Sequence, residues 1–455
     1  MSLLDAKVAA ARLAGAVSRR AGRGGTSLPG KLLLRLEPRA VGRLADRLPE
    51  GTAVVSATNG KTTTTAMAAA ILRRAGHRLV HNRTGANMAG GVAGALLEAS
   101  RRGRIDGDLG LFEVDEFWLD RLADELRPRA LLLGNLFRDQ LDRFGELDAI
   151  ADRWATLVAR LPDAALALNA DDPMIADLGR DRDGEVIYFG IEDAAVALPE
   201  LQHAADAKHC RRCGGPYTHE RVFLGHLGHY HCPRCGARRP QPQVAAEAIQ
   251  LKGLNGSRYR LRTPEGAVDI ELPLPGLYNI YNSLGAASLA LALGVGLDDI
   301  AVALQEAGPA FGRAEAVPIG GRELLMLLVK NPAGANEVLR TLALEDGEHD
   351  ALVVLNDRIA DGRDVSWIWD ADWELAAGRL RRVTCSGTRA AEMALRLKYA
   401  GVPTDRIAVV PEPARGLDAA LAEGEGRLVA IPTYTAMLEL RGLLADRGAV
   451  GGSFG

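Results

Sequence analysis

The sequence GTAVVSATNGKTTTTAMAAAILRRAG, residues 51–76, decides the fold class of this protein. A short β-branched run leads into a Thr-Asn-Gly-Lys-Thr turn, and an alanine-rich stretch follows. This order predicts a strand, a phosphate-cradling loop and a helix, with Lys61 against the β- and γ-phosphates of a nucleotide and Thr62 on Mg²⁺. Val55 stands where the generic phosphate-loop pattern has glycine, so a plain helix-opening turn is the alternative.

Strand-like runs alternate with helix-length segments through most of the chain, which predicts an α/β fold with largely parallel sheets. The first series is TAVVSA, GDLGLFEVDE, RALLLGNL, AALALNADDP and EVIYFGI, and the second is ELLMLLV, DALVVLN, RRVTCSG, RIAVV and RLVAIPT. We predict an N-terminal helical lead over residues 1–48, a central P-loop ATPase domain over 49–315 and a Rossmann-like C-terminal domain over 316–455. A cysteine-rich insertion interrupts the central domain at about 203–242.

The composition is that of an ordinary globular protein, with 455 residues, 47% apolar and 25% charged residues and a net charge of −3. This charge gives no overall attraction to nucleic acid or membranes. No apolar run approaches the roughly 20 residues of a membrane helix, and residues 1–23 lack the apolar core of a secretory signal. We therefore expect a cytoplasmic protein.

Four of the five cysteines form a metal-binding pattern, Cys210-x2-Cys213 and Cys232-x2-Cys235, separated by 18 residues. Four thiolates complete a tetrahedral Zn²⁺ site, which predicts a closed, structural centre. The insertion also carries seven Lys or Arg against one Glu over residues 208–239, so a nucleic-acid-binding zinc ribbon is an alternative. We favour an insertion that the metal holds in its folded form, because the positive charge is confined to this segment and the rest of the chain is acidic. The fifth cysteine, Cys385, is predicted to be a buried thiol.

Further motifs follow the phosphate loop in a characteristic order. They are FEVDE at 112–116, NLFRDQLDRFGELD at 135–148, LNADDP at 168–173, PLPGLYNIYNSLGAA at 273–287 and FGRAE at 311–315. Together they resemble the central ATPase domain of the Mur ligases, the ATP-dependent amino-acid ligases of peptidoglycan synthesis. With the cysteine insertion, NPAGANEVL, LNDRIADGRDVSWIWDAD and IPTYTAMLELR, the sequence most resembles the ligase-like subunits of lipid II isoglutaminyl synthases, over about residues 20–445.

This resemblance implies roles for individual residues. Glu113 would bind Mg²⁺ together with Thr62, Asn279 would contact the adenine with Asn282 nearby, and Arg313 would reach the phosphates or ribose. Without the resemblance, Glu113 could cap a strand, Asn279 could cap a helix and Arg313 could be a surface cation. The residues expected to bind ATP are Thr58, Asn59, Gly60, Lys61, Thr62, Thr63, Asn279 and Arg313.

The sequence also departs from the Mur ligase pattern. Ala57 replaces a glycine of the loop, and Gln140 stands where those ligases carry a histidine near Mg²⁺. No lysine occurs from residue 62 to 207, so the carbamylated lysine of those ligases has no counterpart. These departures put a second Mg²⁺ site in doubt.

The resemblance implies amidation of the D-glutamate α-carboxylate in the lipid II stem peptide, at the inner face of the membrane. An acyl phosphate would react with ammonia from a separate glutaminase subunit of the GatD type, giving a heterodimer. Asp357 follows the apolar run DALVVLN, where α/β sheets place ligands, and is predicted to orient or deprotonate ammonia. The alternatives are a conventional Mur-type amino-acid ligase and a zinc-ribbon nucleic-acid-binding ATPase.

Overall fold

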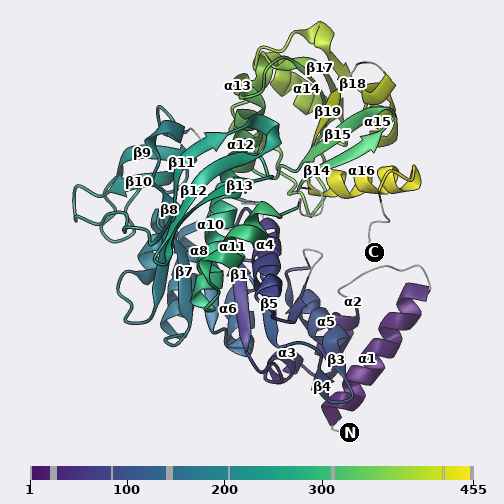
Figure 1. Ribbon diagram of the computed structural model, residues 1–455. Coiled ribbons are helices and arrows are strands. Elements are labelled where there is room, and N and C mark those ends of the chain that lie inside the picture. The colour runs from purple at the N-terminus through teal and green to yellow at the C-terminus, as the bar shows by residue number, and fades with distance from the viewer. Residues whose placement is uncertain are drawn as a thin grey trace.

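Two α/β sheets, each with helices on both faces, form the two lobes of the protein (Figure 1). A computed structural model describes residues 3–20, 28–82, 86–139, 147–202, 205–308, 313–422, 424 and 426–450. Within this part of the chain, no helix is both long enough and apolar enough to cross a membrane.

The larger sheet has nine strands among the described residues. Adjacent strands are parallel except at one edge, where the pairs β11–β12 and β12–β13 are antiparallel. In spatial order they are β13 (Gly266–Leu272), β12 (Ser257–Thr263), β11 (Val244–Leu251), β8 (Val186–Ile191), β7 (Ala165–Asn169), β6 (Ala130–Leu133), β1 (Thr52–Ser56), β5 (Leu109–Glu113) and β2 (Leu79–His81). The chain runs from β1 toward β2 in one direction and later from β6 toward β8 in the other. In open α/β sheets, ligands bind where the strand order reverses in this way, and here that place is the carboxyl ends of the neighbouring strands β1 and β6.

Side chains of the larger sheet alternate between two cores. Ala53 and Val55 belong to one core and Val54 to the other, because successive residues of a strand point to opposite faces. One face is covered by α4 (Lys61–Arg74), α10 (Leu277–Ala292) and α11 (Leu297–Gln305). The opposite face is covered by α3 (Ala40–Ala45), α5 (Ala89–Ala99), α6 (Leu119–Leu126) and α8 (Leu147–Ala159). Both faces are therefore buried, as the apolar strand sequences require.

The N-terminal helices extend the second of these faces. They are α1 (Leu3–Arg20) and α2 (Leu28–Leu36), followed by α3. Within the predicted helical lead over residues 1–48, α2 ends before Pro38 and α3 begins after it, because proline disfavours helical geometry at the residue before it. α2 lies very close to α5: a Cβ at Gly30 would be 2.0 Å from the Gly90 carbonyl oxygen.

The insertion contains a β-hairpin that the sequence analysis did not predict. Its strands are β9 (Thr218–Leu224) and β10 (Leu227–His231), which lie beside the β8 and β11 end of the larger sheet (Figure 1). Phe223, Leu224 and Leu227 near its tip belong to the core of the larger lobe. Hydrophobic contacts therefore attach the tip, although a two-stranded hairpin is marginally stable alone.

The second sheet has six strands within the described residues, all parallel to their neighbours except β14, which the sequence analysis did not identify as a strand. In spatial order they are β14 (Arg313–Ile319), β15 (Arg322–Leu327), β19 (Arg427–Pro432), β16 (His349–Val354), β17 (Leu380–Ser386) and β18 (Ile407–Val409). Its helices are α12 (Pro332–Ala343), α13 (Glu374–Ala377) and α14 (Ala390–Tyr399) on one face and α15 (Pro413–Ala422) and α16 (Tyr434–Asp446) on the other. α12 lies at the junction with the larger lobe, against the turn Gly253–Asn255.

Candidate active site and metal centre

The predicted phosphate loop connects β1 to α4. Gly60 precedes the helix with φ 83°, in the left-handed region that favours glycine, and a Cβ there would be 2.0 Å from Asn282 Oδ1. No side chain caps α4 at Gly60, so its first N–H groups are available to an anion. Of the other predicted loop residues, Thr58 and Thr63 are buried, while Asn59 and Thr62 are half-buried.

Lys61 is held in a buried ion pair. Its Nζ lies 2.7 Å from Glu116 Oε2 and also donates hydrogen bonds to the Ala57 and Thr58 carbonyl oxygens. Burial alone would lower the pKa of Lys61, but the carboxylates of segment 113–116 raise it above its ordinary value. The ammonium therefore stays charged. Glu116 is the last of the three acids of FEVDE, and the sequence alone did not indicate that it pairs with Lys61.

Glu113 ends β5 and lies beside the phosphate loop, opposite Val55 in the strand register. The side chain is buried, and its Oε1 accepts a hydrogen bond from Asn87 Nδ2 at 3.1 Å. Asn82 bonds both the backbone N–H and the carbonyl of Glu113, which fixes the strand end. A fixed carboxylate beside the loop, with the Thr62 hydroxyl in the first turn of α4, is an oxygen donor set suited to Mg²⁺.

The asparagines of α10 are engaged within the protein. Asn279 Nδ2 donates to the Pro275 carbonyl at 2.7 Å, and Asn282 Nδ2 donates to Asn279 Oδ1 at 3.0 Å. Asn282 Oδ1 also accepts from Thr64 Oγ1 of α4 at 3.1 Å. Contact of Asn279 with adenine stays a prediction.

Two residues of interest fall partly or wholly outside the described part of the chain. Arg313 is the first residue of β14, but its side chain does not belong to the described part of the chain. Gln140 lies wholly outside the described residues. Their roles toward the nucleotide stay predictions.

The C-terminal lobe reaches the phosphate loop through the start of α12. The side-chain amides of Asn59 and Asn331 exchange two hydrogen bonds, of 3.2 and 3.0 Å, and Asn331 Oδ1 also caps α12 by accepting from the Gly334 N–H. Next to it, Lys330 Nζ lies 2.6 Å from Asp139 Oδ2. The motif NPAGANEVL gave no sign of these contacts, because nothing in a single sequence pairs residues 272 positions apart.

Asp357 follows β16 at the carboxyl edge of the second sheet. Its carboxylate accepts hydrogen bonds of 2.8 Å from Thr388 Oγ1 and from Arg389 Nε. The Thr388 hydrogen bond and the Arg389 guanidinium lower the pKa of Asp357. An ionised carboxylate of this kind is well suited to orienting ammonia and is a weak base. Asp361, four residues further along the chain, is buried beside the start of α16, where its carboxylate accepts a hydrogen bond from the Thr435 N–H.

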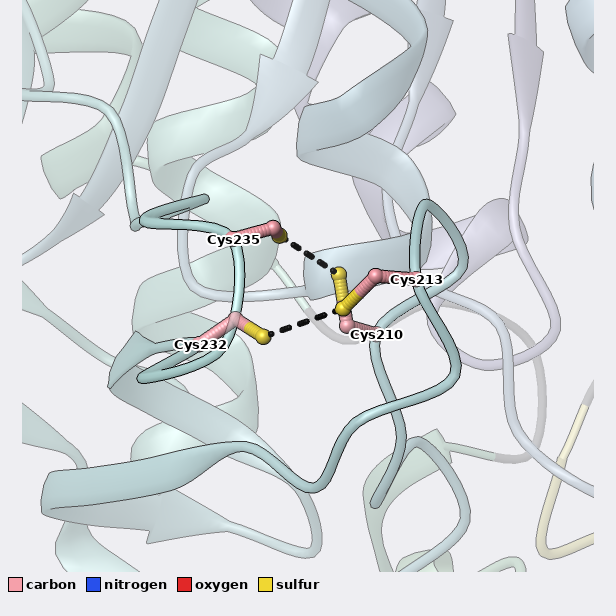
Figure 2. Close-up of side chains that lie close together, drawn as sticks. All are labelled: Cys210, Cys213, Cys232 and Cys235. Carbon is pink, nitrogen blue, oxygen red and sulfur yellow. Dashed lines mark hydrogen bonds between the residues drawn. The ribbon is translucent and has the colours of Figure 1, made fainter.

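The four insertion cysteines come together as two similar turns that face one another (Figure 2). In each turn the first cysteine N–H bonds the carbonyl five residues on, and Gly214 and Gly236 close the turns with φ of 69° and 75°. The four Sγ atoms lie within 4.8 Å of one another. Zn–S bonds of 2.3 Å imply S–S separations of about 3.8 Å in a tetrahedron, and the 3.6 and 3.5 Å separations of Cys210–Cys235 and Cys213–Cys232 fit a Zn²⁺ centre.

Several cations of the insertion are neutralised within the chain. Arg212 Nε lies 2.8 Å from Asp177, Arg211 pairs with Asp152, and Arg239 bonds Asp171 and Glu192. These acids all lie outside the four-cysteine region. The pairing removes much of the charge on which the nucleic-acid alternative depended.

We expect Cys232→Ser to destabilise the protein by about 3 kcal/mol or more, because the metal closes an insertion with little core of its own. Thermal unfolding and zinc content by atomic spectroscopy measure this effect. Cys385→Ser is the matched control, since Cys385 lies buried in the other lobe and should leave the zinc content at one ion per chain. Equal unfolding temperatures of the Cys232→Ser and unaltered proteins would contradict a structural centre.

The fold and the phosphate loop define the class of protein, a Mur-type ligase. Residues 55–231 match the family model of the Mur ligase middle domain, and residues 328–437 match that of the MurT ligase C-terminal region. A solved pseudomurein peptide ligase type C from Methanothermus fervidus shares the fold, with a TM-score of 0.68, 22% identity and coverage of 89% of this chain and 80% of that one.

Two curated relatives narrow the assignment. The lipid II isoglutaminyl synthase (glutamine-hydrolyzing) subunit MurT of Streptococcus pneumoniae is 33% identical, over 95% of this chain and 94% of that protein. The subunit of the same name from Staphylococcus aureus is 31% identical, over 94% of each. The chain belongs to the MurT family.

Proposed function

We propose that this protein converts the D-glutamate α-carboxylate of the lipid II stem peptide into an amide, using ATP and ammonia supplied by a glutaminase subunit. The observation that carries the proposal is that the phosphate loop, with its charged lysine, is hydrogen-bonded to the lobe that bears Asp357. The similarity of nearly the whole chain to two MurT subunits supports the choice of lipid II as the substrate. Because lipid II is membrane-anchored, the reaction would take place at the membrane face.

The first chemical step is phosphoryl transfer to the substrate carboxylate. A carboxylate oxygen attacks the γ-phosphorus, the bond to the leaving ADP oxygen breaks, and an acyl phosphate forms. Lys61 would exchange Glu116 for the phosphate oxygens, and the N–H groups at the start of α4 would hold them. Glu113 and Thr62 would hold Mg²⁺, which neutralises charge during the transfer.

The second step is attack of ammonia on the acyl carbon, which expels phosphate. Asp357 would accept hydrogen bonds from ammonia and stabilise the positive charge that develops on the nitrogen as the C–N bond forms, and the proton that the nitrogen loses would pass to the departing phosphate. Its lowered pKa favours this orienting role over strong base catalysis. A conventional Mur-type ligase would instead need an amino-acid site in this lobe, and ADP release with an amino acid but not with ammonia would favour that alternative.

Ammonia has to come from elsewhere, because glutamine hydrolysis needs an activated nucleophile. Four cysteines form the metal centre, and burial raises the pKa of the remaining one, Cys385, to about 12. A thiol of that kind is a poor nucleophile at neutral pH. We therefore propose a heterodimer with a glutaminase subunit of the GatD type.

The direct test is to co-express the protein with a glutaminase subunit of the GatD type and supply lipid II, Mg-ATP and glutamine. Mass spectrometry of the product should show one carboxyl group converted to an amide, with ADP released in equal amount. Formation of a peptide bond to an added amino acid would contradict the proposal.

We expect Asp357→Asn to lower the amidation rate by about a hundredfold, since the negative charge that faces ammonia is lost. The KM for ATP should change little, because Asp357 lies in the other lobe. Asp364→Asn is the control, as that exposed aspartate bonds the Ser366 N–H and hydroxyl nearby. Unaltered amidation by Asp357→Asn would show that another residue handles ammonia.

A further inference from the structure

The four-cysteine insertion has its metal centre and its hairpin tip at opposite ends. One cysteine pair precedes β9 and the other follows β10, so the sulfur cluster closes the open end of the hairpin. The tip, Gly225 and His226, packs against Phe137, which lies in the segment Asn135–Asp139 of the larger lobe. This arrangement connects the insertion to a part of the chain far from the cysteines.

The segment Asn135–Asp139 forms one wall of the phosphate loop. Asn135 Oδ1 accepts the Asn59 N–H at 2.9 Å, and its Nδ2 donates to the Asn59 carbonyl at 3.1 Å. The Thr58 N–H bonds the Asn135 carbonyl, and the Phe137 N–H donates to Thr58 Oγ1. Four hydrogen bonds thus make the loop conformation depend on this segment.

The insertion holds the same segment at two points. Asp206, four residues before Cys210, is almost fully buried and accepts the Arg138 N–H at 2.9 Å as well as the Arg138 guanidinium. On the other side, the His226 ring lies 4.7 Å from the Phe137 ring, and a Cβ on Gly225 would be 2.8 Å from Phe137.

His226 is unusual for a buried histidine. It is fully buried, and neither ring nitrogen makes a hydrogen bond within the described residues. Its Nε2 lies 3.4 Å from Asp172 Oδ2, the oxygen that accepts the Leu136 N–H at 2.9 Å. The ring therefore acts by its volume, between the wall segment and the aspartate that anchors it.

We propose that the four-cysteine insertion positions the phosphate loop: Asp206 and His226 fix the wall segment Asn135–Asp139 and thereby set the affinity for nucleotide. The inference rests on the proposed function, since it assumes that the loop binds ATP. Asp206 and His226 are positioning residues, because they act through Asn135 and Phe137 and do not touch the nucleotide site themselves. The insertion thus gains a role beyond stability.

The test is the dissociation constant for Mg-ADP, measured by calorimetry on the full zinc-loaded chain at a temperature where each variant is folded. Asp206→Ala should weaken binding about tenfold, and Asp206→Asn should weaken it less because the amide oxygen still accepts the Arg138 N–H. Arg212→Ala is the control: it breaks an ion pair between the insertion and the larger lobe at Asp177, away from the wall segment, and should leave affinity within about twofold.

A second pair of variants tests the role of the His226 ring. Neither His226→Phe nor His226→Ala keeps the ring nitrogens, but only the phenylalanine keeps a ring against Phe137. We expect near-normal Mg-ADP affinity for His226→Phe and about tenfold weaker binding for His226→Ala.

Wild-type affinity in both Asp206→Ala and His226→Ala would overturn the inference and leave the proposed function standing. Equal weakening by Arg212→Ala would also overturn it, since the effect would then be a general loosening of the insertion. If the unaltered protein did not bind Mg-ADP, the proposed function would fail, and the inference with it.

Discussion

Lys61→Ala should lower ATP-dependent amidation by about a thousandfold, because the proposed function places this buried cation against the transferred phosphoryl group. The measurement is ADP release and amide formation with saturating lipid II and ammonium at neutral pH. Zinc content should stay at one ion per chain, since the cysteine cluster lies in the insertion and makes no contact with Lys61. Near-normal turnover would exclude Lys61 from the reaction.

The structure adds a control that the sequence did not indicate. Removing Lys61 leaves Glu116 buried without its partner at 2.7 Å, and a buried charge without a partner costs about 3 kcal/mol. Lys61→Ala should therefore also unfold at a lower temperature. Adding Glu116→Gln should restore much of the stability without restoring activity. If the double variant recovered activity together with stability, the loss in Lys61→Ala would reflect folding.

The isolated chain should amidate lipid II with high ammonium but not with glutamine, and adding the glutaminase subunit should raise the glutamine-dependent rate by about a hundredfold or more. The physical reason is that free ammonia is mostly ammonium at neutral pH, so a partner has to release ammonia next to the acyl phosphate. The measurement compares both nitrogen sources with and without the partner.

A partner carrying a substitution of its own nucleophilic cysteine is the control for this experiment. It should bind and leave the ammonium-dependent rate intact while abolishing the use of glutamine. Robust use of glutamine by the isolated chain would refute the division of labour between two subunits.

Local sequence was sufficient for much of the fold. The β-branched and apolar runs of β1, β5, β6, β7 and β8 were visible because strands buried on both faces have few polar residues. The hairpin β9–β10 was missed, since His and Arg interrupt its apolar residues and its tip is buried by the larger lobe. β14 was missed because it pairs with β15 at the sheet edge and has an irregular register near its start.

The sequence by itself determined the chemistry that short motifs encode. Gly60 and Lys61 predict a phosphate loop because such a turn needs a left-handed residue and the phosphates need a cation. Likewise, two Cys-x2-Cys turns predict a zinc centre, because each turn can direct two sulfurs to one ion, and the structure brings the four sulfurs together. These properties depend on neighbours within a few residues, so they can be seen in one chain.

Only the tertiary structure decided which distant residues surround those motifs. Glu116 pairs with Lys61, Asn331 bonds Asn59 from the other lobe, and the insertion reaches the wall of the phosphate loop through Asp206 and His226. Each contact joins segments whose approach depends on how two sheets and an insertion pack together. Packing free energy, summed over the whole core, sets such approaches, and no local pattern in the chain encodes it.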